Sequence, residues 1–134
     1  MSVEKRVAAY LALAAQDAEA AGLLLAGGNR YAAYHIQQAV EKLTKALLLA
    51  RGIEAGIEHR LEELFKRFAD KTGWPERLSA FAGYSAYATA FRYPTTGGRI
   101  PADPPAEALR RDLSSLHDLI AKVRDELLGS TSGR

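Results

Sequence analysis

Apolar side chains recur every three or four residues along most of this chain, a period typical of amphipathic helices rather than strands. The pattern predicts five helices, over about residues 3–26, 31–51, 58–71, 75–91 and 104–128. The inward-facing positions are Val7, Leu11, Ala14, Ala18, Ala21 and Leu25 in the first helix, Ala33, Ile36, Val40, Leu43 and Leu47 in the second, Leu61, Leu64, Phe65 and Phe68 in the third, Phe81, Tyr84, Tyr87 and Phe91 in the fourth, and Leu109, Leu113, Leu116, Ile120, Val123 and Leu127 in the last. The chain is therefore expected to be all-α.

Turn-forming residues separate these helices. Glycine follows four of them, and glycine adopts the left-handed conformation of a helix C-terminus without steric cost. Asp103 and Pro104 are expected to be the N-cap and first residue of the last helix. The longest irregular segment is residues 92–101, where Thr, Gly and Pro cluster.

The short connections favour helices that run antiparallel to their sequence neighbours. We therefore expect an up-and-down antiparallel helical bundle of four to five helices. A length of 134 residues fits one domain. The expected boundaries are 1–129 for the domain and 130–134 for a flexible C-terminal tail.

The second predicted helix has apolar residues outside its main stripe. At 100° per residue, Tyr34, Gln38, Glu41 and Lys45 are expected to project away from the core. Leu48 and Leu49 lie off the stripe, so this helix is central in the bundle, in contact with a partner subunit, or both. With the aromatic residues of the fourth helix, this apolar surface predicts a dimer.

Composition narrows the class of protein but not its ligand. The chain is 48% hydrophobic and 25% charged, with a formal net charge of +2 and a pI of about 9.0, which neither requires nor excludes nucleic acid. There is no cysteine, and the three histidines lack carboxylates at ligand spacing, so we expect no metal and no cofactor. We see no signal peptide and no membrane span, and expect a soluble cytoplasmic protein.

Several motifs carry a resemblance to a known family. The run YHIQQAVEKLTKALLL, residues 34–49, resembles the QQAxEKxxKAxL signature of HEPN domains. Arg51 and Gly52 follow it, as in the family. HRLEEL at residues 59–64 is similar to the H-x-L-x-x-L opening of the family's third helix, and FRYP at 91–94 is similar to an ARYP run that closes the fourth. The resemblance covers about residues 7–127.

The resemblance implies a helical bundle that is commonly a homodimer, encoded in prokaryotes beside a minimal nucleotidyltransferase as a two-gene, toxin–antitoxin-like pair. Some members of the family are toxins that cut RNA, and others are thought to bind nucleotides or to act as non-catalytic partners. Fold is implied more firmly than activity.

Ribonucleases of this family use an arginine and a histidine with four to six residues between them. Arginine can hold a phosphate, and histidine can transfer a proton near neutral pH. Here no histidine follows Arg92 before His117, so the motif is absent at the family's position. Arg110 and His117, which share one flank of the last helix, are the alternative catalytic pair; His35, His59 and His117 are otherwise structural or partly exposed residues.

Two groups of polar residues are candidate sites. Arg92, Arg99, Lys42 and Lys45 are expected to bind nucleotide or RNA phosphate, with backbone N–H groups of Gly97 and Gly98 helping to cradle it. Gln38, Glu41 and His59, together with Lys45, are expected to form a polar cluster between the second and third helices.

The sequence leaves three candidate functions open. The first is a dimeric binding or regulatory module that contacts nucleotide or RNA phosphate or partners a nucleotidyltransferase. The second is a metal-independent endoribonuclease that uses Arg110 and His117. The third is a dimerisation bundle that has no ligand.

Overall fold

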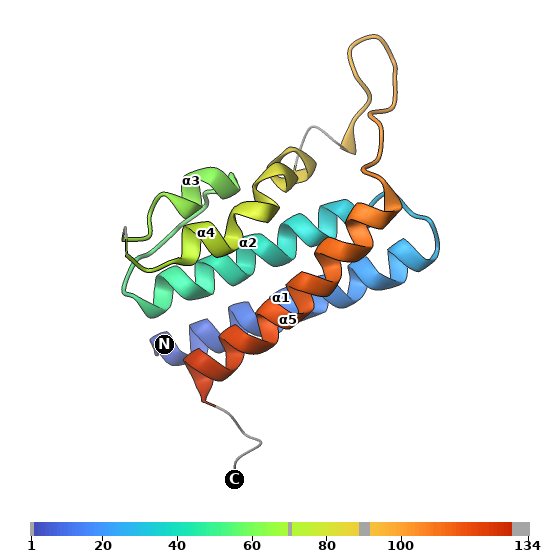
Figure 1. The fold of residues 1–134 in the computed structure, drawn as a ribbon. Coiled ribbons are helices and arrows are strands. Elements are labelled where there is room, and N and C mark those ends of the chain that lie inside the picture. Colours follow the sequence, from blue (N-terminus) through green and yellow to red (C-terminus); the bar gives the residue numbers. More distant parts are fainter. Residues whose placement is uncertain (1, 70, 89–91, 130–134) are drawn as a thin grey trace.

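A computed structural model describes residues 2–69, 71–88 and 92–129, and these residues form an all-α bundle (Figure 1). The elements are α1 (Val3–Ala26), α2 (Ala32–Ala50), α3 (Leu61–Phe65), α4 (Trp74–Leu78), the 3₁₀ helix η1 (Ser79–Ala88) and α5 (Ala106–Leu128). The predicted all-α class is confirmed. The predicted tail lies outside the described residues, as does Phe91.

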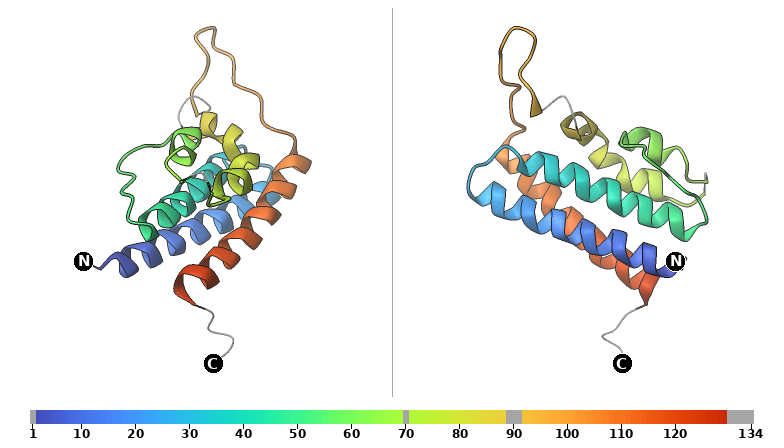
Figure 2. Two further views of the ribbon diagram at one scale, coloured as in Figure 1. Left: turned by 60° about the vertical axis from the view of Figure 1, so that its left-hand side comes forward. Right: turned by 180° about the vertical axis from the view of Figure 1, so that it is seen from behind.

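The three long helices form the body of the bundle. α1 and α2 lie side by side and antiparallel, and α5 crosses α1 in the opposite direction (Figures 1 and 2). Between α2 and α5 the chain passes through α3, α4 and η1, which cover the face of α2 remote from α1. The path is up-and-down, with a third leg built from short pieces.

Helix α2 is the centre of the bundle. It contacts α1, α3, η1 and α5. Leu48 is fully buried and Leu49 is 6% exposed within the single chain. Of the two explanations for these leucines, the central position is therefore correct. These two leucines therefore give no support to a dimer, which stays a prediction.

The third and fourth predicted helices are shorter and less regular than expected. α3 has five residues instead of a helix over 58–71. Phe68 is buried as predicted although it lies beyond the end of α3, and Arg67 Nη1 donates to Ala55 O (2.8 Å). The predicted helix 75–91 is a short α4 followed by the ten-residue η1. Gly83 and two serines in η1 have weak helix propensity, which favours the tighter 3₁₀ form.

The last helix begins at Ala106, later than predicted. Asp103 and Pro104 are each followed by proline, and a residue before proline is disfavoured in the helical conformation. Helix formation therefore starts only after Pro105. The Asp103 carboxylate instead lies 3.6 Å from Arg30 Nη1. The helix ends at Gly129, whose φ is +78°.

Helix α1 is long and apolar enough to meet the length and hydropathy of a membrane span, with a mean hydropathy of 1.2. The sequence expectation overlooked this because three polar residues interrupt the segment, but its many alanines and leucines keep the mean high. Val7, Leu11, Ala14, Ala18 and Ala21 form its buried stripe, and the helix packs on α2 and α5. In the structure, this stripe is buried in the bundle and most of the remaining surface of the helix is not.

Candidate functional site

A groove lies at the end of the bundle where the α1–α2 turn meets the loop between η1 and α5. Its volume is about 290 Å³. It is lined by Arg30, Tyr31, Arg92, Tyr93, Pro94, Ile100 and Pro101. Figure 1 shows the loop, in gold and orange, projecting away from the helices at this end. Two arginines and two tyrosines from distant parts of the sequence are therefore brought together.

Arg30 connects the α1–α2 turn to the loop. Gly28 has a φ of +70°, which allows the chain to reverse before Arg30. Arg30 Nη2 donates to Pro101 O (2.6 Å), and Asp103 lies nearby. This arginine therefore holds one wall of the groove and adds positive charge to it.

Arg92 lies on the opposite wall and is exposed. Its guanidinium carbon is 4.8 Å from the centre of the Tyr34 ring and 5.8 Å from that of Tyr93. Among the described residues no carboxylate pairs with it. Ring stacking orients a guanidinium while leaving the N–H donors on its edge available to a ligand.

The loop tip is folded more tightly than predicted. Thr95 N donates to Arg99 O (2.7 Å), Gly98 N donates to Thr95 O (2.8 Å), and Arg99 N donates to Thr95 Oγ1 (3.0 Å). The Gly98 amide is therefore used within the turn and does not contribute to the predicted glycine cradle for phosphate. Arg99 is exposed at the tip but does not line the groove.

The predicted lysine ligands lie elsewhere. Lys42 Nζ donates to Asp17 Oδ2 on α1, and Lys45 Nζ donates to Glu41 Oε2 (3.0 Å). Lys45 lies about 16 Å along α2 from Tyr34, at 1.5 Å per residue. The structure therefore does not bring Lys42 and Lys45 together with Arg92.

The predicted polar cluster is assembled, and its Glu41 and Lys45 side chains are buried. Glu41 Oε2 lies 2.9 Å from His59 Nδ1 and also accepts from Lys45. Gln37 Nε2 donates to Glu41 Oε1 (3.0 Å), and Gln38 Nε2 donates to Gln37 Oε1 (2.7 Å). Glu41 and Lys45 are only 5% and 7% exposed, so the expectation that they project away from the core is wrong.

The burial has a clear cause, because the segment that leads into and through α3 covers this side of α2. Ala55, Leu61 and Leu64 are buried on it. Gln37 Nε2 also donates to His59 O (3.3 Å), which fastens the covering segment to α2. The cluster joins two elements. Gln37, which was not among the predicted members, is fully buried in it.

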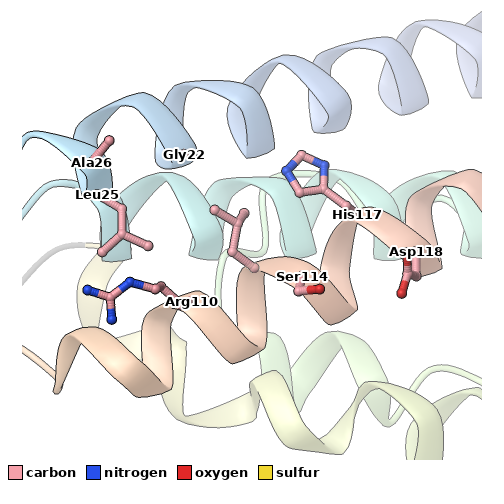
Figure 3. Close-up of a pocket in the computed structure, with 8 residues that line it drawn as sticks. Gly22, Leu25, Ala26, Arg110, Ser114, His117 and Asp118 are labelled. Carbon is pink, nitrogen blue, oxygen red and sulfur yellow. The ribbon is translucent and has the colours of Figure 1, made fainter.

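A second groove, of about 500 Å³, runs between α1 and α5. Its lining includes Arg110, Ser114, His117 and Asp118 of α5, opposite Gly22, Leu25 and Ala26 of α1 (Figure 3). Arg110 and His117 thus share one groove, but Figure 3 shows their side chains apart. Arg110 Nη1 donates to Glu107 Oε1 (2.7 Å).

The remaining histidine has a structural contact. His35 Nδ1 lies 3.0 Å from Asp17 Oδ1, and the same carboxylate accepts from Lys42. These contacts join α2 to α1. Among the described residues no group of three or more histidine and carboxylate side chains is arranged to hold a metal ion.

Two tyrosines of η1 lie close to acidic residues: Tyr84 is close to Asp112 of α5, and Tyr87 is close to Asp103 of the loop before it. Tyr84 Oη donates to Asp112 Oδ2 (2.6 Å), and burial, followed by this hydrogen bond, raises the pKa of Tyr84 above its usual value. Burial and then the charge of Asp103 raise the pKa of Tyr87. Both hydroxyls therefore remain protonated near neutral pH, and buried Tyr84 is a core residue rather than a base-stacking platform.

Comparison with known proteins identifies the fold family. No curated protein and no solved structure shows significant similarity to the chain. The family model of the HEPN domain matches residues 7–125, nearly the whole of the 134-residue chain. The match spans α1, α2 and the motifs that follow them, and it extends through most of α5. This chain belongs to the HEPN domain family.

Proposed function

We propose that this HEPN domain is a binding module that holds a nucleotide or single-stranded RNA in the groove formed by the α1–α2 turn and the loop after η1. The observation that carries the proposal is the stacking of Arg92 on Tyr34 and Tyr93 at the edge of that groove. Membership of a family associated with RNA binding and toxin–antitoxin roles supports the same class of ligand.

The chemistry of the groove suits a nucleotide. Tyr93 is 61% exposed and Tyr31 39%, so ring surface is available for a base to stack on. The Arg92 guanidinium can donate two N–H groups to one phosphate, and the charge of Arg30 stands on the opposite wall. A site of this kind binds by stacking and charge with little sequence preference.

The same module is proposed to act in a regulatory pair with a minimal nucleotidyltransferase. Family membership is the support for this partner, and the exposed loop supplies a surface that a partner can reach. In that arrangement the groove reports the presence of a nucleotide or RNA to the partner.

A second candidate function is metal-independent RNA cleavage by Arg110 and His117. The observation that favours it is that both side chains line one groove of α5 together with Ser114 and Asp118. Arg110 would hold the phosphate and His117 would move a proton, with the 2′-hydroxyl of the RNA as nucleophile.

The binding proposal is tested by titrating a short fluorescent oligoribonucleotide, and separately ATP, with the wild-type protein and with the Arg92→Ala variant. Arg92→Ala should weaken binding by about 1–3 kcal/mol, roughly 5- to 150-fold, because it removes charge-assisted hydrogen bonds. The melting temperature should change little, since Arg92 is exposed and its stacking is worth only about 0.5–1 kcal/mol.

Arg124→Ala is the matched control, because Arg124 is exposed on α5, outside this groove. Equal weakening by both variants would indicate general charge attraction and contradict the proposal, as would an unchanged affinity of Arg92→Ala. Gel analysis of the same RNA separates the two functions: intact RNA supports binding alone, and cleavage that His117→Ala abolishes supports the nuclease.

A further inference from the structure

The groove between α1 and α5 presents apolar and polar side chains in a definite order. Along α5, Leu113 lies about one turn after Arg110 and one turn before His117, and all three line the groove. Gly22 and Leu25 of α1 line its other side. A volume of about 500 Å³, with largely apolar walls and a few polar groups, is typical of sites that bind small molecules.

Gly22 leaves the α1 wall of this groove without a side chain. It lies inside a 24-residue helix, where alanine or leucine would be the better helix former. Its φ is not positive, and outside its own helix an added Cβ atom would meet only Leu113 Cδ2, at an ordinary 3.7 Å. Glycine here therefore lowers helix stability without relieving a clash, and its effect in the structure is to keep the groove open.

The polar side chains of the groove are available to a ligand. Among the residues that the structure describes, the side chains of Ser114, His117 and Asp118 form no hydrogen bond or ion pair. Arg110 pairs with Glu107 at 2.7 Å, but the Glu107 side chain is 91% exposed, and exposed pairs of this kind contribute little. The groove thus has a cation at one end and an unpaired imidazole and carboxylate at the other.

We propose that this groove binds a small aromatic carboxylic acid that carries a hydroxyl group on the far side of its ring. The Arg110 guanidinium donates two N–H groups to the ligand carboxylate. The ring packs on Leu25, Leu113 and the bare backbone of Gly22, which removes apolar surface from water. The ring hydroxyl forms its hydrogen bond at the end where His117 and Asp118 lie.

The spacing of the polar groups fits a ligand with a single ring. Arg110 precedes His117 and Asp118 by seven and eight residues, which is about 10–12 Å along the helix axis. A hydrogen bond of about 3 Å at each end leaves roughly 4–6 Å for the ligand. One six-membered ring with substituents at opposite positions fills that length. Figure 3 shows the Arg110 side chain at the Leu25 end of the groove and the His117 ring pointing toward α1.

The proposal goes beyond the binding function proposed above, because this groove and the Arg92 groove share no residue. It uses Arg110 and His117, as the alternative cleavage function does, but it also gives the apolar walls a role. A phosphate held by Arg110 would leave Leu25 and Leu113 uncovered, whereas an aromatic ring covers both.

Titration of ¹⁵N-labelled protein with 4-hydroxybenzoate, followed by two-dimensional NMR, tests the proposal. The amide signals of residues 22–26 and 110–118 should shift saturably, with a Kd at or below about 1 mM, as expected for a ligand with one ring. 4-Hydroxybenzamide has nearly the same shape but no negative charge. It should bind at least about tenfold more weakly, because it cannot form the ion pair with Arg110.

Gly22→Leu is the most informative variant, because its side chain fills the groove. It should lower the affinity for 4-hydroxybenzoate at least about tenfold, while the melting temperature stays the same or rises, since leucine is a better helix former than glycine. Arg110→Gln, at an exposed position, should reduce the affinity for the acid to that for the amide, and it decides the test if Gly22→Leu does not fold. Arg111→Gln is the matched control and should bind like the wild type, because Arg111 is exposed on the same helix but lines neither groove of α5.

Signals that do not shift up to the solubility limit of 4-hydroxybenzoate would overturn the proposal. An amide that binds as tightly as the acid would do the same, as would an equal loss of affinity in Arg110→Gln and Arg111→Gln or an unchanged affinity in folded Gly22→Leu. Arg92→Ala should bind 4-hydroxybenzoate like the wild type, so failure here and failure of the nucleotide or RNA binding proposal are distinguishable.

Discussion

A carboxylate that is almost fully buried is stable only when its oxygen atoms are hydrogen-bonded, because burial removes it from water. Glu41 meets this condition with Gln37 on one oxygen and with Lys45 and His59 on the other. His59 is 62% exposed, so the network reaches solvent at this residue. Glu41 is thus the residue on which the polar side of α2 depends.

Glu41→Ala should lower the free energy of unfolding by about 3–5 kcal/mol, because it leaves the buried Lys45 ammonium without its partner. Denaturant unfolding followed by circular dichroism measures the change. Glu63→Ala is the control, since it breaks the exposed pair with Lys66 and should cost less than about 1 kcal/mol. Similar losses for the two variants would contradict the assigned role of Glu41.

At the scale of elements, α3 is too short to be stable by itself, since isolated helices need about 12–15 residues. Its start is held by a residue from another element. Leu61 N donates to Ser85 Oγ of η1 (2.8 Å), and Ser85 Oγ donates to Glu62 Oε2 (3.0 Å). Ser85 therefore acts as an N-terminal cap supplied from outside the helix.

Ser85→Ala should destabilise the protein by about 0.5–2 kcal/mol, as the loss of a capping side chain does. Hydrogen exchange should speed up first in α3 and η1, while α2 amides remain protected. Ser79→Ala is the comparison, because Ser79 Oγ donates only to the nearby Glu76 O at an exposed position. Equal effects of the two changes would show that the contact with α3 contributes nothing.

The long helices could be predicted from the sequence, and the short ones could not. α1 begins and ends at the predicted residues, and α2 and the end of α5 differ by a residue or so, because a sustained apolar stripe and terminal glycines define them. α3 and η1 depend on contacts between segments, such as that of Ser85 with Leu61, which no local pattern records.

For the whole molecule, the sequence identified one wall of the candidate groove. Arg92 was predicted to bind a ligand because it lies in the longest loop. Arg30, Tyr31 and Tyr34 lie in the α1–α2 turn or at the start of α2, and the sequence did not predict that they contact a ligand. Periodicity predicts the direction in which a side chain points from its helix. It does not predict whether another segment of the chain packs over that side chain and buries it. Lys45 was misplaced for that reason.

The loop that carries Arg92 also makes the molecule divisible into two pieces. Residues 92–100 are all exposed, so trypsin should first cut within this loop, after Arg99 and after Arg92. The fragment that contains α5 should nevertheless stay attached under native conditions, because five buried apolar side chains hold that helix to the bundle.

Size-exclusion chromatography of the nicked protein should therefore give one main peak, which denaturant resolves into two large fragments identified by mass spectrometry. Fragments that separate without denaturant would contradict this. A peptide that supplies α5 should then be able to complement a chain that ends before it, so the loop is a place where the chain can be divided and reassembled by association alone.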